Sequence, residues 1–257
     1  MIKTNYPTNV TDKQWQVIEK ILDGQKRKRK HSLREIFNAL LYLLKTGCQW
    51  RMLPLGFPKW ELVYYYYSRW KDDGTFEEIN EILRNMIRKQ KGKPLSPSVG
   101  LIDCQSVKTT RVGGEARGYD GNKKVKGRKR HIITDTNGCL LSVVIHAANE
   151  HESQTGLGVM NTLQYRFNRM QKIYADGGYR GELVGQVKQQ LGWDLEITLR
   201  SDKTSEFKPL PKRWIIERTF SWLENFRRLA KDYEYSVSSS AAMVFLAFIA
   251  LALNCIF

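Results

Sequence analysis

The chain has 257 residues, enough for one large domain or two modest ones. Hydrophobic residues make up 42% of it and aromatic residues 11%, which argues against global disorder because a sizeable core can be buried. The formal net charge is +16, from 42 Lys and Arg against 26 Asp and Glu. Such an excess predicts a polyanionic partner such as nucleic acid. The alternative is a basic protein whose charge serves only solubility.

The four cysteines are scattered, with no CxxC pair: Cys48, Cys104, Cys139 and Cys255. Their spacing suits neither a disulfide framework nor a zinc site, which predicts reduced thiols in a cytosolic protein. The histidines His131, His146 and His151 also lack metal-ligand spacing. The first ten residues have neither the charged start nor the apolar stretch of a signal peptide. We therefore expect a cytoplasmic protein.

One long apolar run extends from Ala241 to Phe257 and carries no charge. Its 17 residues lie at the short limit for a membrane-spanning helix, and no second span or flanking basic anchor accompanies it. A membrane anchor is the alternative, but the pattern favours a helix buried in the core of the second domain. We expect no membrane partner.

Residues 1–90 have the pattern of an all-α region. Three capping-box patterns occur, each followed by apolar residues at helical spacing: Thr11-x-x-Gln14, Ser32-x-x-Glu35 and Thr75-x-x-Glu78. The segment WELVYYYYSRWK, residues 60–71, is a candidate for a further helix. Short helices joined by turns suit a helix-turn-helix-like DNA-binding domain, which we predict over residues 1–92.

A polar stretch with two prolines, residues 89–100, marks the predicted boundary between domains. Strand patterns follow at 99–103, 131–134, 140–147, 172–175 and 194–199, and helical patterns at 154–170, 182–191 and 214–231. The turn Asp-Thr-Asn-Gly at 135–138 signals a hairpin. We predict an α/β domain over residues 93–257, and the order of its elements matches a ribonuclease-H-like fold, a mixed sheet flanked by helices.

Three acids are placed where this fold can bring them together. Asp103 ends the first strand, Asp176 follows the fourth, and Glu217 lies in the last amphipathic helix. Such carboxylates can bind two Mg²⁺ ions about 3.5–4 Å apart, and hard oxygen ligands favour Mg²⁺ over zinc. Each acid alone has an ordinary explanation as a turn or solvated residue, and spacing does not separate Glu217 from Glu224, two helical turns later. Together, in this order, they predict a site for phosphodiester chemistry.

These motifs resemble an insertion-sequence DDE transposase of the insertion-sequence-five type, within the insertion-sequence-four-like superfamily. The resemblance covers nearly the whole chain and rests on TDKQWQVIEKIL, TGCQWRMLP, YYYYSRWKDDGTF, LIDCQSVKT, KKVKGRKRHIITDTNG, YADGGYRG and RWIIERTFSWLENFRRLAKDYE. It assigns the catalytic and metal-binding roles to Asp103, Asp176 and Glu217. It also implies two Mg²⁺ ions per active site, with Mn²⁺ as a substitute.

The family pattern also places basic residues around the glutamate. An Arg precedes it with three intervening residues, and Arg213 matches that position. A basic residue follows about two turns later in the family, where this chain has Glu224; Arg227 or Arg228 is the candidate replacement. Leu210 stands where the family has a Tyr. These departures concern how strand ends are held and leave the triad intact.

Basic and aromatic segments supply candidate DNA contacts, with a solvated loop as the ordinary alternative for the basic runs. The two runs are Lys26, Arg27, Lys28, Arg29, Lys30 and Lys123, Lys124, Lys126, Arg128, Lys129, Arg130. The tyrosine-rich segment adds Lys59, Tyr64 and Arg69, although at least two of its aromatics are expected to pack inside. We expect Trp214, Phe220 and Trp222 to be core residues, with base stacking as the alternative.

The leading hypothesis is an enzyme that binds transposon terminal inverted repeats, cleaves there, and joins the freed 3′ hydroxyl to target DNA. Its partners are double-stranded DNA and a second copy of the chain, because two ends must be held together. We expect it in the prokaryotic cytoplasm, on the nucleoid. The alternatives are a ribonuclease-H-like nuclease or resolvase that cuts without joining, and a non-catalytic DNA-binding regulator, against which the intact triad argues.

Overall fold

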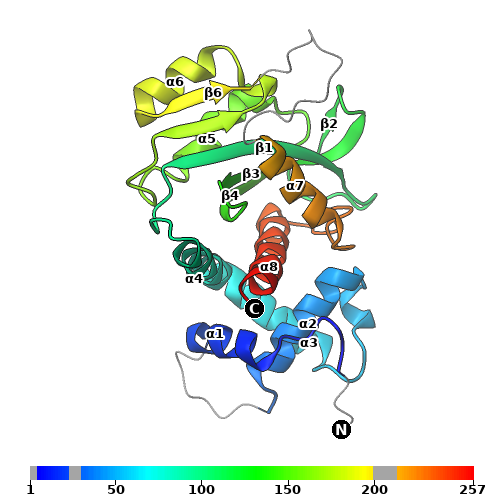
Figure 1. Ribbon diagram of the computed structural model, residues 1–257. Coiled ribbons are helices and arrows are strands. Elements are labelled where there is room, and N and C mark those ends of the chain that lie inside the picture. The colour runs from blue at the N-terminus through cyan, green and yellow to red at the C-terminus, as the bar shows by residue number, and fades with distance from the viewer. Residues whose placement is uncertain (1–4, 23–29, 199–212) are drawn as a thin grey trace, which may run out of the picture.

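The computed structural model describes residues 5–22, 30–198 and 213–257 (Figure 1). Within these ranges a mixed sheet forms one part of the molecule and a group of helices the other. The C-terminal helix α8 (Val237–Ile256) runs between them and packs on both (Figure 1). The sheet and the helical group are therefore held together by an element from the end of the chain.

The helical group contains α1 (Asp12–Leu22), α2 (Leu33–Thr46), η1 (Trp50–Met52), α3 (Trp60–Asp72) and α4 (Thr75–Gln90). The first two capping boxes are confirmed, since Thr11 and Gln14 exchange hydrogen bonds before α1, as do Ser32 and Glu35 at the start of α2. The third is wrong. Gly74, with a φ of 77°, caps α4, and Thr75 is already helical. The cap residue has a left-handed backbone conformation, which glycine adopts without strain.

The six-stranded sheet has the order β2-β3-β1-β5-β6, with β4 also paired to β3. Its strands are β1 (Val99–Lys108), β2 (Gly118–Asp120), β3 (Val125–Asp135), β4 (Leu140–Ala147), β5 (Lys172–Ala175) and β6 (Asp194–Ile197). The β1–β3, β2–β3 and β3–β4 pairs are antiparallel, whereas β1–β5 and β5–β6 are parallel. This mixed α/β architecture is compatible with the ribonuclease-H-like fold expected from the sequence.

Helices cover both faces of the sheet (Figure 1). Successive strand residues point to opposite faces, so β1 directs Ile102 toward α5 (Glu152–Asn161) and α6 (Glu182–Leu191), and Leu101 toward α7 (Arg213–Glu224). The turn η2 (Gly177–Tyr179) follows β5. The helices expected at 154–170 and 214–231 end earlier, at Asn161 and Glu224. β1 is therefore covered on both faces.

One hydrophobic core continues from the helical group into the sheet. It includes Ile36 and Leu40 from α2, Val143 from β4 and Leu246 from α8. Two hydrogen bonds reinforce the contact, from Tyr67 to the Ser239 carbonyl at 2.6 Å and from Asn80 to the Phe245 carbonyl at 3.0 Å. Residues from both sides of the predicted boundary at 92/93 thus pack into the same core.

Helix α8 is buried, as its apolar composition predicts. By length and composition it is the one helix in the described ranges that could cross a membrane, and 61% of its 18-residue apolar window is buried inside the protein. Its neighbours include α2, α3, α4, α7 and β4. Core packing therefore accounts for the absence of charge along its length.

Candidate active site

Asp103 and Asp176 come from neighbouring parallel strands. Leu101 of β1 pairs with Tyr174 of β5, and each aspartate lies two residues after its member of that pair. Paired strands are about 4.8 Å apart, so the two carboxylates start from adjacent positions. Both aspartates line one cavity of about 10 Å³, which has room for about one water molecule.

Backbone hydrogen bonds hold both carboxylates. Asp103 Oδ1 accepts the Cys104 N–H at 2.7 Å. Asp176 Oδ1 accepts the Gly178 N–H at 2.9 Å and so caps η2. Each aspartate is half-buried. These bonds orient one oxygen of each carboxylate through a backbone donor.

Glu217 lies on the helix that covers the two aspartates. Ile215 and Ile216 of α7 pack against Leu101, and Ile216 lines the cavity that Asp103 and Asp176 share. Glu217 is the next residue, and its side chain is exposed. Glu217 therefore follows, in the sequence of α7, the residue that lines the cavity. Within the described ranges, no group of three acids, histidines or cysteines is close enough to hold one metal ion.

Glu217 and Glu224 have different neighbours in the structure, a difference that sequence spacing alone does not reveal. Gln105 lies two residues beyond Asp103 on β1, and its side-chain nitrogen is 3.4 Å from Glu224 Oε1. Glu224 is thus paired farther along β1, whereas Glu217 directly follows the residue that lines the aspartate cavity. Because the donors are hard carboxylate oxygens, the site suits Mg²⁺ or Mn²⁺. Coordination by all three acids requires the Glu217 side chain to approach the aspartates.

Glu152, the first residue of α5, lies on the other face of β1 and was not among the residues predicted from the sequence. Burial disfavours its charged form, but the hydrogen bond from Cys104 and the ammonium groups of Lys129 and Lys123 outweigh burial, and together they lower its pKa. Burial, followed by nearby acidic groups including Glu152, raises the pKa of Tyr179. No local pattern marks Glu152, since its neighbours come from β1, β3 and η2.

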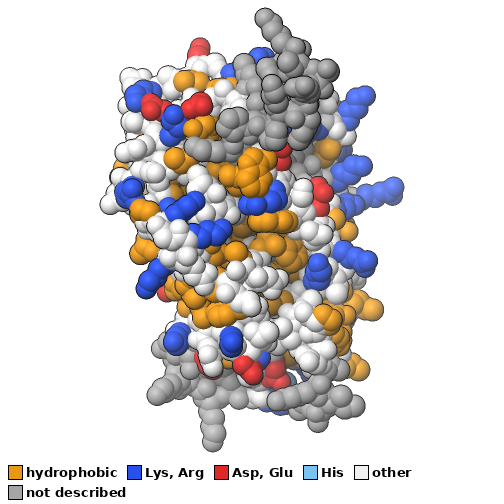
Figure 2. Space-filling view, viewed as in Figure 1, with side chains coloured by type: hydrophobic (Ala, Val, Ile, Leu, Met, Phe, Trp, Pro, Cys, Tyr) orange, Lys and Arg blue, Asp and Glu red, His pale blue; other side chains and the backbone are white. Residues whose placement is uncertain are grey.

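Several candidate DNA contacts are exposed and stay predictions: Lys30, Lys59, Tyr64, Arg69, Lys123, Lys124, Lys126 and Arg227. In Figure 2, Lys and Arg side chains are distributed over both the sheet and the helical parts of the face shown. Such a distribution is compatible with a polyanion that touches both parts. The remaining predicted positions lie outside the part of the chain that the structure describes: Lys26, Arg27, Lys28, Arg29, Leu210 and the side chain of Arg213.

Four predicted phosphate contacts are instead buried: Arg128, Lys129, Arg130 and Arg228. Arg128 pairs with Asp232 at 3.2 Å, and Arg228 pairs with Glu234 at 2.7 Å. Arg130 donates to the Leu229 carbonyl at 2.8 Å, and Lys129 to the Glu150 carbonyl at 2.9 Å. The prediction that these four reach phosphates is corrected, because their charged ends have acceptors inside the protein.

The aromatic residues divide between core and surface. In α3, Tyr67 and Trp70 are buried, whereas Tyr64 and Tyr65 are exposed. In α7, Phe220 packs against the core, as predicted. Trp214 and Trp222 instead flank Arg218, whose guanidinium carbon is 4.7 and 4.3 Å from the two ring centroids.

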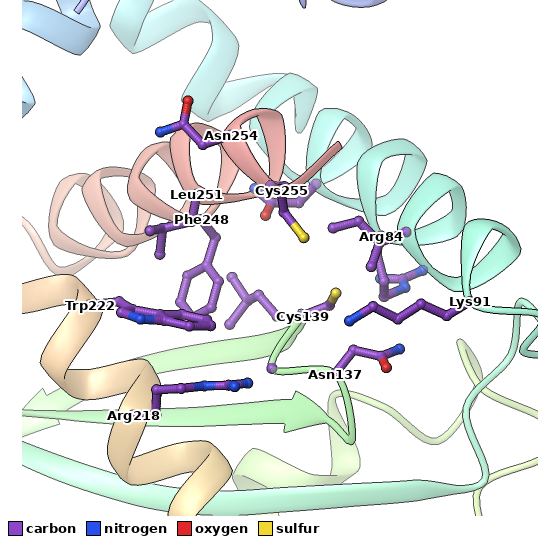
Figure 3. A pocket seen from close by; sticks show the side chains of 15 residues that line it. Arg84, Lys91, Asn137, Cys139, Arg218, Trp222, Phe248, Leu251, Asn254 and Cys255 are labelled. Atoms are coloured by element: carbon purple, nitrogen blue, oxygen red, sulfur yellow. The ribbon is translucent and has the colours of Figure 1, made fainter. Parts of the chain in front are cut away.

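A pocket of about 380 Å³ lies between α4, α7, α8 and the β3–β4 turn (Figure 3). Arg84, Lys91 and Arg218 contribute positive charge, Trp222 and Phe248 contribute aromatic surface, and no acid is among the lining residues. Arg218 and Ile216 lie about 200° apart around α7. The pocket is therefore on the opposite side of this helix from the aspartate cavity, and its charge suits an anion.

Comparison with known proteins gives the family. The sequence-family model "Transposase DDE domain" matches residues 94–255. The family model "Putative transposase of IS4/5 family" matches residues 10–80. The putative transposase for insertion sequence element IS402 of Burkholderia cepacia is 31% identical over 116 residues, 42% of this chain and 54% of the relative. The chain thus spans about half the length of this curated relative. Since the DDE-domain match covers more than half of the chain, the protein belongs to the IS4/IS5-type family of DDE transposases.

Proposed function

We propose that the protein cleaves DNA at the terminal inverted repeats of an insertion sequence and joins the freed 3′ ends to target DNA. Asp103, Asp176 and Glu217 are the catalytic carboxylates of this proposal. The observation that carries it is the placement of the two aspartates on adjacent parallel strands, lining one cavity beneath the helix of Glu217. Membership of a transposase family supports the same assignment.

Each part of the site has a distinct task in this proposal. Two divalent cations held by the three carboxylates would activate the attacking water or 3′ hydroxyl and stabilise the leaving oxygen. The N–H groups of Cys104 and Gly178 orient Asp103 and Asp176. The packing of α7 on β1 would fix the position of the Glu217 backbone relative to Asp103 and Asp176.

The protein would act as a dimer on DNA, because strand transfer requires two transposon ends to be held together. It would do so in the prokaryotic cytoplasm. Residues 1–92, with their exposed Lys59, Tyr64 and Arg69, would form the helix-turn-helix-like part that binds the repeats. Light scattering with and without end DNA measures the oligomeric state. A complex that never contains two copies would contradict the dimer.

The decisive variant is Asp103→Asn, tested on a plasmid that carries the element with its native flanking DNA. The wild-type protein is expected to nick at the element boundary with Mg²⁺ or Mn²⁺ and to be inactive with EDTA. Asp103→Asn should lower the nicking rate at least about 100-fold, because even outer partners of metal ligands cost 10- to 100-fold. Mapping of strand ends provides the measurement.

A matched control is Asp194→Asn, which alters an exposed carboxylate of the same sheet that pairs with Lys188 at 2.7 Å. This control should retain cleavage. Equal nicking by Asp103→Asn and wild type, or nicking that resists EDTA, would refute the proposed site. Cleavage without joining would favour a nuclease or resolvase, and specific binding without cleavage a regulator.

A further inference from the structure

We propose that Glu152 is a positioning residue for the metal site, because its carboxylate connects the two segments that carry Asp103 and Asp176. This inference rests on the proposed function, in which those aspartates hold the divalent cations. Glu152 comes from the start of α5, a third element that contributes none of the predicted catalytic acids. Its side chain is 17% exposed, so it lies largely inside the protein.

The first half of the connection passes through Cys104. The Cys104 N–H donates to Asp103 Oδ1 at 2.7 Å, and the Cys104 thiol donates to Glu152 Oε1 at 2.9 Å. Because neighbouring strand residues face opposite sides of the sheet, Cys104 binds the catalytic aspartate through its backbone and Glu152 through its side chain. Glu152 thereby restrains β1 at the residue that orients Asp103.

The second half of the connection passes through Gly178. Its N–H donates to Asp176 Oδ1 at 2.9 Å. A Cβ on Gly178 would lie only 2.0 Å from Glu152 Oε2 and 3.1 Å from Asp176 Oδ1. Glycine is therefore required for the carboxylate of Glu152 to lie against the turn of Asp176, and the two acids approach each other over it.

Lys129 supplies the positive charge that this grouping of acids needs. Its Nζ lies 3.5 Å from Glu152 Oε1 and 3.8 Å from Asp120 Oδ2. The Lys129 side chain is 7% exposed, so solvent screens these attractions only weakly. Lys129 thus holds the Glu152 carboxylate in place.

This arrangement has a chemical consequence. Two carboxylates that share metal ions must keep a fixed separation, and groups behind the ligands commonly provide it. Glu152 touches both segments, whereas each backbone hydrogen bond acts within one. Loss of Glu152 should therefore weaken metal binding more than it weakens the fold.

The test compares Glu152→Gln with Glu150→Gln in the full chain, using isothermal calorimetry with Mn²⁺ alone. Glutamine keeps the size of Glu152 but removes its charge. We expect Glu152→Gln to weaken Mn²⁺ binding about 10-fold or more. Glu150, whose carboxylate faces His146 at 3.7 Å, is the control and should leave the affinity unchanged. Equal affinities for the two variants would overturn the inference.

A double-mutant cycle between positions 152 and 178 tests the contact itself. Gly178→Ala should weaken Mn²⁺ binding in the wild-type background, because its Cβ displaces the Glu152 carboxylate. In the Glu152→Ala background only the 3.1 Å approach to Asp176 Oδ1 remains, so Gly178→Ala should cost less affinity than in the wild-type background. Independent, additive losses would contradict the inference. Circular-dichroism melts identify variants that lose metal through unfolding.

The same titration on Asp103→Asn separates the two claims. If Asp103→Asn loses Mn²⁺ binding and Glu152→Gln keeps it, the inference about Glu152 fails and the proposed active site stands. If Asp103→Asn binds Mn²⁺ as wild type does, the proposed metal site itself fails.

Discussion

The basic run KKVKGRKR divides into two regions with opposite environments. Lys123, Lys124 and Lys126 are exposed, whereas the three cations of residues 128–130 are buried in β3. Gly127 lies at the division, where a Cβ would be 1.9 Å from the Val107 carbonyl oxygen of β1. The comparison teaches that a run of positive charge does not by itself indicate a DNA contact.

The buried arginines bind the chain segment that connects α7 to α8. Arg128 donates to the carbonyls of Glu234 and Tyr235 and pairs with Asp232. Arg130 donates to the Leu229 carbonyl, and burial lowers its pKa to about 10. These residues therefore hold the segment that follows the Glu217 helix against the sheet.

The largest expected effect comes from Arg128→Met, which tests whether the buried region serves the fold. Loss of the Arg128 guanidinium leaves the carboxylate of Asp232, which is 1% exposed, without its ion pair to Arg128. We expect the free energy of unfolding to fall by about 3–5 kcal/mol, as for other broken buried pairs. Urea unfolding followed by circular dichroism provides the measurement.

Lys126→Met is the matched control for Arg128→Met, two residues earlier on the same strand but exposed. Its effect on stability should stay within about 0.5 kcal/mol. Similar losses from the two substitutions would remove the distinction between the two regions.

The double variant Lys124→Gln/Lys126→Gln tests the exposed region and has a smaller expected effect. If each lysine neutralises one phosphate, the slope of log K against log salt concentration should become shallower by about 0.9 per lysine lost. Fluorescence anisotropy with labelled end DNA across a salt series measures this slope. An unchanged slope would show that these lysines, although exposed, do not contact phosphates.

Much of the fold could be predicted from local patterns. β4, β5 and α6 have the expected bounds, because apolar periodicity and turn residues define them. β3 begins six residues before the expected position 131, and β2 was not expected. The early start of β3 has a physical cause, since charged residues such as Arg128 enter a strand when distant segments supply their hydrogen-bond acceptors.

The candidate site was predictable to a similar extent. Asp103 and Asp176 were expected to come together, and they line one cavity. The expectation that Asp103 ends its strand was wrong, because β1 continues to Lys108 through its pairing with β3. The different neighbours of Glu217 and Glu224 could not be predicted from the sequence, because both residues lie on one helical face and only the packing of α7 separates them. Glu152 required the whole fold, since its contacts join Cys104, Lys129 and Gly178 from three separate segments.

The most direct test of the three-carboxylate site is end-specific cleavage by Glu217→Gln and Glu224→Gln, measured with Mg²⁺ on the same plasmid. The proposed site predicts that Glu217→Gln lowers the cleavage rate at least about 100-fold, since it removes a metal ligand. Glu224→Gln should stay within a few-fold of wild type, because Glu224 contacts Gln105 and lies two turns from the cavity. Normal cleavage by Glu217→Gln, with loss of cleavage in Glu224→Gln, would contradict the assignment.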